Sequence, residues 1–424
     1  MTAKRPIFMT IVWLITFVIF VFTSLTLVLY ALGYRFNISK RTLENTGGIV
    51  LKTRPKNATI TLDGETITNK TPAQILGLSK GNHYLKVELN NHISWEKTIS
   101  VVSGLVNDFS DIILFNKNPD TRILMSGLNF WLANDNHTIA ALEDDMISLF
   151  DTISNQKKIL FSLTKPDANK KVETQWSTNG NKLIISVINK NSPREFFVVD
   201  KNNPTNIFDL TKLIPQEIKK VVFKPNQNDA YILSGSTLYL SDINKNSKTL
   251  IAKNISQFYI QNSNHILLQS SNNNVIMTDS LGRNRAIIGQ LNNDNLIFAQ
   301  NNFILTQLGN LYFTSNKMTK IDKNVHEVTI LDDNSALYVK DIGEIRIFKD
   351  GISKIITRYA GPVTLVGYFN NYYPLFIQNN LLYAIDAEGN NQTLLAKNVQ
   401  KAALVNNAVL IISNSQLKIV TLSD

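Results

Sequence analysis

The feature that most constrains this chain is an uncharged, apolar run close to its N-terminus. No Asp, Glu, Lys or Arg occurs among the 26 residues from Ile7 to Leu32. As an α-helix rising 1.5 Å per residue, the run extends about 39 Å, more than the ~30 Å hydrocarbon core of a bilayer. Tyr30 and Tyr34 fall where aromatic side chains gather at a membrane interface. The run therefore predicts one transmembrane helix over residues 7–33.

A cleaved signal peptide is the alternative interpretation of this run. Ala31-Leu32-Gly33 offers small residues in a cleavage-like pattern. The apolar core of a signal peptide, however, is only about 7–15 residues long, and this run is much longer. We therefore expect an uncleaved anchor.

Flanking charge does not by itself orient the helix. Lys4 and Arg5 precede it, whereas Arg35, Lys40 and Arg41 follow it. The positive-inside rule does not choose between these ends, but long domains cross a membrane largely regardless of flanking charge. Because only six residues precede the run, we expect a short tail inside and the rest of the chain outside the cytoplasm. The three basic residues after the helix are expected to meet lipid headgroups.

Period-two alternation of apolar residues begins after the polar stretch Asn37 to Asn45. Asp63-Gly64 stands between alternating segments and is a strong hairpin signal. Tyr84 to Leu89 and Trp95 to Val102 alternate cleanly. Strands are expected at residues 49–51, 58–62, 84–89, 95–102 and 112–115. The pattern predicts a small, strand-rich β-sandwich of short antiparallel strands over residues 46–115.

The order of turns in this segment resembles the PEGA domain. The namesake tetrapeptide aligns with Pro55-Lys56-Asn57-Ala58, at which two of the four positions differ, and is followed by Asp63-Gly64, Thr71-Pro72, Gly81-Asn82-His83 and Trp95. The resemblance implies a noncatalytic module, usually on the surface of a prokaryotic cell, that interacts with envelope components or other proteins. From the strand pattern we expect Trp95 to fill the sandwich core, and His83 and His92 to be turn or rim residues.

A repeat array follows the polar linker Asn116 to Asp120. Each unit contains apolar strands separated by Asn-rich turns, as in Asn380-Leu-Leu-Tyr-Ala-Ile-Asp and Gln392-Thr-Leu-Leu-Ala-Lys. Units start near residues 128, 172, 219, 255, 294, 326, 362 and 400. Four short strands in a repeat of about 40 residues are typical of a β-propeller blade. We predict an all-β chain apart from its anchor, with an eight-bladed propeller over residues 120–424, or a seven-bladed one if a unit is miscounted.

The last unit, from Val399 to Asp424, has room for only three strands. Thr121 to Gly127 is a spare strand that resembles the fourth-strand segments beginning at Thr249 and Thr393. We therefore expect the 121–127 strand to close the ring, with Ile123-Leu124 pairing near Ile419-Val420.

One further resemblance supports the propeller. Gln175 to Leu183 resembles the Trp-Ser-Pro-Asp-Gly-Lys stretch of TolB-like and WD40-like propellers, and Phe223-Lys-Pro-Asn-Gln is a fainter copy. Trp131 and Trp176 are expected to pack at blade starts.

Signatures of catalysis and metal binding are missing from the sequence. The chain has no Cys, which excludes thiol nucleophiles and Cys-based metal sites. It carries no His-Glu-x-x-His, phosphate-loop, Gly-x-Gly-x-x-Gly or Gly-x-Ser-x-Gly pattern. The histidines (83, 92, 137, 265 and 326) are scattered, and the acidic doublets Asp144-Asp145 and Asp332-Asp333 are interpreted as turn residues. We therefore expect no enzyme, no cofactor and no catalytic or metal-binding residue, and the ligand-binding residues stay unassigned.

Charge also limits the range of partners. Of the net charge of +10, only +5 falls on residues 116–424, and no basic run is interleaved with aromatic residues, so a nucleic-acid partner is not expected. The sequence predicts a single-pass envelope protein whose propeller binds a protein or a cell-wall polymer. The alternatives are an extracytoplasmic hydrolase or peptidase with its site on the propeller face, and a cytoplasmic scaffold of reversed topology. The oligomeric state stays open.

Overall fold

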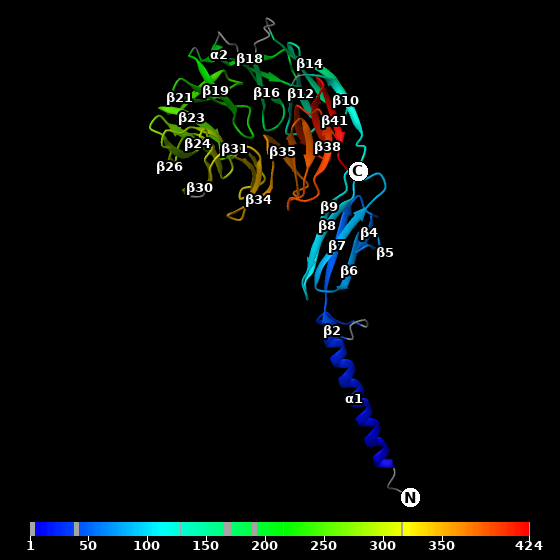
Figure 1. Ribbon diagram of the computed structural model, residues 1–424. Helices are drawn as coiled ribbons and strands as arrows, with labels where there is room; N and C mark the ends of the chain where they lie inside the picture. The colour runs from blue at the N-terminus through cyan, green and yellow to red at the C-terminus, as the bar shows by residue number, and fades with distance from the viewer. Residues whose placement is uncertain are drawn as a thin grey trace. The chain divides into compact units, whose positions relative to one another are not determined.

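The computed structural model contains two compact units, formed by residues 1–119 with 423–424 and by residues 120–422 (Figure 1). Each unit is described by itself. The structure describes residues 5–37, 42–127, 129–163, 171–188, 193–214, 216–314 and 317–423.

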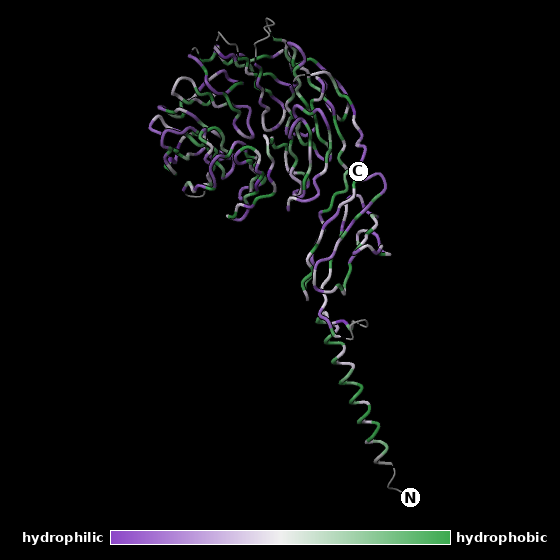
Figure 2. Tube along the Cα trace, viewed as in Figure 1, coloured by the Kyte–Doolittle hydropathy of each residue, from purple (hydrophilic) through white to green (hydrophobic). Residues whose placement is uncertain are grey.

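Helix α1 (Arg5–Ala31) contains the uncharged run and is apolar along its length (Figure 2). Its stretch Phe8–Ala31 is long and apolar enough to cross a membrane, and the protein buries none of it. The hydroxyls of Thr16, Thr23 and Thr26 each donate to a carbonyl one turn back, so their polar atoms are satisfied within the helix. The helix begins and ends two residues before the expected 7–33 limits.

The helix ends at Ala31, and Gly33 follows with a φ of +85°, which suits the left-handed position after a helix. Two short strands follow, β1 (Tyr34–Asn37) and β2 (Thr42–Asn45), which pair as a hairpin. This stretch was not expected to contain strands, because its residues are polar, but the structure shows a two-stranded hairpin. Arg35 stacks 3.6 Å from the centre of the Tyr30 ring and donates to the Tyr30 carbonyl. Lys4, Lys40 and Arg41, three of the basic residues that flank the apolar run, lie outside the described residues.

The small β-sandwich consists of two sheets. The strands of the unit are β3 (Gly47–Arg54), β4 (Thr59–Leu62), β5 (Glu65–Ile67), β6 (Ala73–Leu78), β7 (Gly81–Glu88), β8 (Trp95–Val101) and β9 (Val106–Ile113). One sheet has the order β6-β3-β9 and the other β5-β4-β7-β8. Their facing sides bury one core that includes Ile49, Leu51, Leu85 and Trp95. Trp95 is 3% exposed, which confirms its predicted core position.

Two features of the sandwich correct the sequence interpretation. Strands β3 and β9 pair in parallel, although only antiparallel strands were expected. The reason is that β8 and β9 belong to different sheets, so the chain crosses between sheets instead of turning back in a hairpin. Strand β6 was not predicted, and β9 begins at Val106, six residues before the expected start at Ile112.

The second unit contains a ring-forming series of four-stranded antiparallel sheets, eight of them in the part of the chain that the structure describes. The first strands are β11 (Asn129–Leu132), β15 (Lys171–Trp176), β19 (Ile218–Phe223), β23 (Ile255–Ile260), β27 (Leu296–Gln300), β31 (Val325–Ile330), β35 (Val363–Phe369) and β39 (Lys401–Val405). The second strands are β12 (Thr138–Glu143), β16 (Lys182–Ile188), β20 (Ala230–Ser234), β24 (His265–Ser270), β28 (Phe303–Thr306), β32 (Ala336–Lys340), β36 (Tyr373–Gln378) and β40 (Ala408–Ser413). The third strands are β13 (Met146–Asp151), β17 (Glu195–Asp200), β21 (Thr237–Asp242), β25 (Asn274–Asp279), β29 (Leu311–Thr314), β33 (Glu344–Lys349), β37 (Leu381–Ala384) and β41 (Gln416–Thr421). The fourth strands are β14 (Lys157–Ser162), β18 (Ile207–Asp209), β22 (Ser247–Lys253), β26 (Ala286–Gln290), β30 (Met318–Asp322), β34 (Ile352–Arg358), β38 (Thr393–Lys397) and β10 (Thr121–Ser126). A single helical turn, α2 (Leu210–Leu213), follows β18 and was not expected in an all-β unit.

Strand β10 supplies the fourth strand of the last sheet, whose order is β10-β41-β40-β39. It runs antiparallel to β41, with Thr121 opposite Val420 and Met125 opposite Leu417. The register shifts at Leu124, so the side chain of Met125 turns inward and is 6% exposed. This one ladder joins the two ends of the unit, since Thr121 and Val420 are 299 positions apart in the sequence.

A register shift of this kind recurs in the fourth strands β14, β22, β26, β30, β34 and β38. In most of them an exposed aliphatic residue is followed by a buried one at the shift, as in Ile159-Leu160, Leu250-Ile251 and Ile355-Ile356. A β-bulge and flanking lysines blunt an edge strand against pairing with another sheet. The paired aliphatic residues in the repeated fourth-strand sequences therefore reflect a recurring bulge at the rim.

Asparagine builds the turns between these strands. The sequence contains 52 Asn, about one residue in eight. Of the 25 described non-glycine residues with positive φ, 20 are Asn. Asn tolerates the left-handed region because its short side chain can bond the local backbone. The high Asn content is thus explained by turn geometry.

Candidate ligand-binding groove

The turn from β11 to β12 is organised by Asp135. One carboxylate oxygen accepts from the backbone N–H groups of His137 (3.0 Å) and Thr138 (2.8 Å), and the other accepts from the Thr138 hydroxyl (2.7 Å). These bonds form because Asp readily caps the backbone two and three residues further on. They fix the carboxylate at the end of the first sheet.

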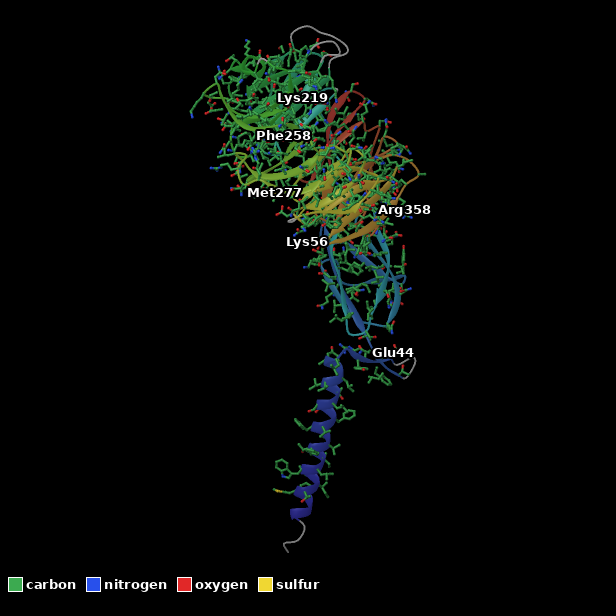
Figure 3. The ribbon with its side chains drawn as sticks, turned by 90° about the vertical axis from the view of Figure 1, so that its left-hand side faces the viewer. Glu44, Lys56, Lys219, Phe258, Met277 and Arg358 are labelled. Atoms are coloured by element: carbon green, nitrogen blue, oxygen red, sulfur yellow. The ribbon has the colours of Figure 1, made fainter. Side chains whose placement is uncertain are left out.

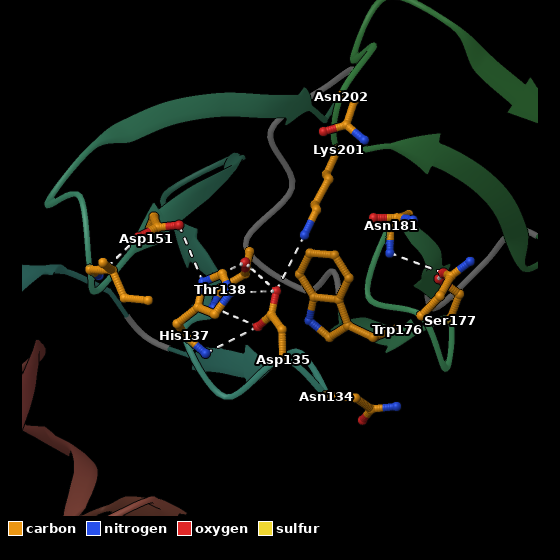
Figure 4. Close-up of polar contacts among 12 residues, drawn as sticks. Asn134, Asp135, His137, Thr138, Asp151, Trp176, Ser177, Asn181, Lys201 and Asn202 are labelled. Atoms are coloured by element: carbon orange, nitrogen blue, oxygen red, sulfur yellow. Dashed lines mark hydrogen bonds and ion pairs between the residues drawn. The ribbon is translucent and has the colours of Figure 1, made fainter. Parts of the chain in front are cut away.

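A cation from the neighbouring sheet reaches this carboxylate. Lys201, directly after β17, places its Nζ 3.2 Å from Oδ2 of Asp135, and both side chains are 21% exposed (Figure 4). Partial burial alone would raise the pKa of Asp135, but the hydrogen bonds from Thr138, the His137 backbone and Lys201 lower it to about 2. Asp135 therefore stays ionised and joins two adjacent sheets.

His137 lies between two carboxylates. Its Nδ1 is 3.2 Å from Oδ2 of Asp151, and its Nε2 is 3.5 Å from Oδ2 of Asp135 (Figure 4). Asp151 ends β13, where its other oxygen accepts from the backbone N–H groups of Ile153 and Ser154. The backbone bond from Ser154 is the main reason that the pKa of Asp151 is lowered. The imidazole is thus held by side chains fixed in two different turns.

His137, Asp151 and Lys201 border a cavity of about 240 Å³, which we call the Asp135 groove because Lys201 and Thr138 in its wall contact Asp135. Its wall includes the cations and amides of Lys157, Lys158, Lys201, Gln156 and Asn202, together with His137, Thr138, Leu149, Phe150, Asp151 and Ser154. Lys158 donates to the Lys201 carbonyl at 2.5 Å, and Lys157 pairs with Glu143 at 2.5 Å. The groove therefore offers both donors and acceptors beside an apolar floor, an arrangement suited to holding a polar chain.

The hydroxyl nearest to His137 in this groove is not free to act as a nucleophile. Thr138 Oγ1 is 3.4 Å from Nδ1 of His137, but it donates to Asp135 and the residue is 5% exposed. Among the residues that the structure describes, no group of three or more His, Asp or Glu side chains is placed to hold a metal ion. The Thr138 hydroxyl therefore serves the turn at Asp135.

Residues selected from the sequence occupy structural positions. His83 contacts Asp63 at 2.6 Å and the Ser79 carbonyl at 2.8 Å, at the hairpin turn. His92 lies in the turn before β8 but is 8% exposed, so it is more buried than a rim residue. Trp176 packs in the core between the first two sheets, and its indole donates to the Trp131 carbonyl at 3.0 Å.

Turn acids recur from sheet to sheet. Aspartates end or follow the third strands of several sheets, and each accepts backbone N–H groups of the following turn: Asp151, Asp200, Asp242, Asp279 and Asp386. Asp332 of the second acidic doublet likewise accepts from Asn334 and Ser335. The sequence gives no sign that His137 and Lys201 lie in one groove, because the repeated Asp positions mark turns without showing which turns meet.

The fold defines a β-propeller joined to a small β-sandwich and one apolar N-terminal helix. Residues 46–110 match the model of the PEGA domain. Among solved structures, the C-terminal WD40 domain of Sif2 is similar with 11% identity and a TM-score of 0.51, covering 72% of this chain and 98% of that chain.

Two other solved structures are less similar. BamB from Moraxella catarrhalis has 10% identity and a TM-score of 0.46, covering 72% of this chain and 96% of that chain. Dipeptidyl peptidase 4 from Porphyromonas gingivalis has 13% identity and a TM-score of 0.47, covering 69% of this chain and 56% of that chain. No curated protein matches the sequence. The match to the PEGA domain model and the likeness to the WD40 domain of Sif2 confirm the predicted PEGA resemblance and the propeller fold.

Proposed function

We propose that this chain is a single-pass membrane-anchored scaffold of the cell envelope, whose propeller binds a protein or a cell-wall polymer without catalysis. The observation that carries the proposal is the stretch Phe8–Ala31 of α1, which has no charged residue and is long and apolar enough to cross a membrane. A helix with such a surface is stable in hydrocarbon and unfavourable in water. The PEGA match over residues 46–110 supports a surface location.

The groove at Asp135 is the proposed contact region of the propeller. Its side chains are fixed by turns and by the Lys201 ion pair, so a partner meets preorganised donors and acceptors. Lys158 and Asn202 line the groove without holding the Asp135 turn. The variant Asn202→Ala should therefore weaken capture of the envelope partner while leaving the fold intact.

Two experiments test the proposal. Protease added to intact, wall-stripped cells should degrade the part of the chain beyond residue 40, whereas protection until lysis would reverse the topology. Pull-down of the solubilised protein from native envelopes should recover a partner whose yield falls in Asn202→Ala, with Asn264→Ala in a different turn as the matched control. Turnover of a peptide or ester substrate by the purified protein would instead establish the hydrolase alternative.

A further inference from the structure

A second cavity lies between the second and third sheets of the propeller. Its volume is about 370 Å³, and its wall combines residues of β15, β16 and β17 with the strand β19 of the next sheet. No residue of this cavity takes part in the Asp135 groove. It is a separate site, built where two sheets diverge.

Two hydroxyls in this wall, those of Ser186 and Thr174, have no hydrogen-bond partner among the residues that the structure describes. Ser186, in the middle of β16, is 6% exposed, and its Oγ is buried and unpaired. It stands opposite Glu173 of β15 and Phe196 of β17 in the ladder, and all three residues line the cavity. Leaving a buried hydroxyl unpaired costs free energy, so such a group marks a position where a ligand atom can complete the bonding.

Two cationic side chains share this cavity wall with Ser186. Arg194 and Lys219 are exposed and line the same cavity. The register of the β19–β20 ladder shifts between Ile218 and Lys220, so Lys219 lies at a bulge (labelled in Figure 3). A bulge changes the direction in which a side chain points relative to the regular alternation of a strand. The one carboxylate in the wall, Glu173, is already paired with Lys171 at 2.6 Å. The groups of this wall that remain available to donate a hydrogen bond are therefore the Arg194 guanidinium, the Lys219 ammonium and two hydroxyls.

Lys220 does not belong to this donor set, although it borders the cavity. Its Nζ donates to the Phe258 carbonyl at 2.8 Å and lies 3.3 Å from the centre of the Tyr259 ring, both on β23 of the following sheet. Burial lowers the pKa of this ammonium to about 7. Its role is to join β19 to β23.

We propose that the cavity between the second and third sheets binds a phosphate-type oxyanion, with Arg194 and Lys219 neutralising it and Ser186 donating from the floor. Guanidinium and ammonium groups recognise such anions through charge-assisted hydrogen bonds. This proposal extends the proposed envelope-binding function by naming a ligand class. It rests on that function only where it names the source of the anion, which is either free phosphate or a phosphodiester of a wall polymer.

The test uses the full chain in detergent at constant ionic strength. Inorganic phosphate should bind in calorimetric titration and raise the melting temperature, with chloride as the reference. Ser186→Ala and Arg194→Gln should each weaken binding about tenfold, as expected for loss of one hydrogen bond to a charged group. Ser186→Ala removes an unpaired hydroxyl, so it should not lower the melting temperature without phosphate.

Ser241→Ala is the matched control, because Ser241 Oγ is also buried and unpaired but lies on β21, outside this cavity. The control should bind phosphate like the unaltered chain. Equal phosphate affinity in all variants, or no binding by the unaltered chain, would overturn the proposal.

Poly(glycerol phosphate) serves as the second probe and identifies the source. Tighter binding of the polymer per phosphate indicates a wall polymer, and equal binding indicates the free anion. Because phosphate binding does not depend on topology, a failure here leaves the anchored-scaffold proposal standing, and a failed envelope pull-down leaves this site standing.

Discussion

Removal of β10 is expected to unfold the propeller, although it deletes only one short strand. The comparison is between fragments of residues 118–424 and 128–424, which differ by β10 alone among the strands. The shorter fragment leaves β41 as an unpaired edge and exposes the apolar face that Leu124 and Met125 cover. Residues 120–422 form one compact unit, so the longer fragment should fold.

The magnitude follows from the contacts of β10. Met125 is buried against Leu410 and Leu417, and Leu124 packs partly buried against the same cluster. Burial of two such side chains contributes about 3–6 kcal/mol, and the ladder bonds to β41 add roughly 0.5–1.5 kcal/mol each. Their sum is comparable to the about 5–15 kcal/mol that stabilises a typical folded domain. Deletion should therefore remove most of the stability.

Guanidinium unfolding followed by the fluorescence of Trp131 and Trp176 measures the effect. The 118–424 fragment should show a cooperative transition, and 128–424 should be aggregated or unfolded without denaturant. Two point variants of β10 compare a buried side chain with an exposed one. Met125→Ala should lower the free energy of unfolding by about 2–5 kcal/mol. Ile123→Ala, at a residue 56% exposed, should lower it by less than about 0.5 kcal/mol. Equal midpoints for the two fragments would refute the closure model.

Three further predictions concern other parts of the chain. The pKa of Asp135 is lowered from 3.8 to about 2 in the folded state, so its contribution, about 1–2 kcal/mol after allowance for screening, is present above pH ~4 and is lost as the pH falls towards 2; the urea midpoints of the unaltered chain and Asp135→Asn should converge over this range, and a constant difference would contradict the assignment. Trp95→Ala should destabilise the sandwich by about 3–5 kcal/mol in a thermal melt, while Tyr84→Ala, at a residue 44% exposed, should cost clearly less; equal losses would show that Trp95 is not the core anchor. Ile15→Arg with Ile19→Arg should release the chain from membranes on carbonate extraction, because each arginine costs about 2.5–3.5 kcal/mol at the centre of a membrane helix, and full retention of this variant would exclude α1 as the anchor.

Local patterns predicted much of the strand plan. The alternation around Asp63-Gly64 gave the hairpin of β4 and β5, because the turn type and the side-chain faces are both set by neighbouring residues. The expected unit starts near residues 172, 219 and 255 fall within one residue of β15, β19 and β23. Strand β6 and the hairpin of β1 and β2 were not predicted, because their residues lack clear alternation. These segments are extended because they pair with neighbouring strands.

Contacts across sheets could not be predicted in the same way. His137 and Asp151 are 14 residues apart in one blade, but Asp135 and Lys201 are 66 apart and meet only because two sheets pack side by side. The parallel pairing of β3 with β9 has the same origin, because the chain's path between two sheets, and no local signal, sets the strand direction. The unpaired state of Ser186 likewise depends on what the next sheet places opposite it.

The sequence by itself determined the apolar helix, the sandwich with its turn residues, and the run of short strands linked by Asn-rich turns. Each of these depends on interactions within a few residues: hydropathy over one helix length, side-chain alternation along a strand, and backbone angles that Asn or Gly allows. Only the tertiary structure decided the Asp135 groove and the cavity at Ser186. Both lie between sheets, where charge, burial and hydrogen bonding are fixed by residues far apart in the chain that the packing of blades brings together.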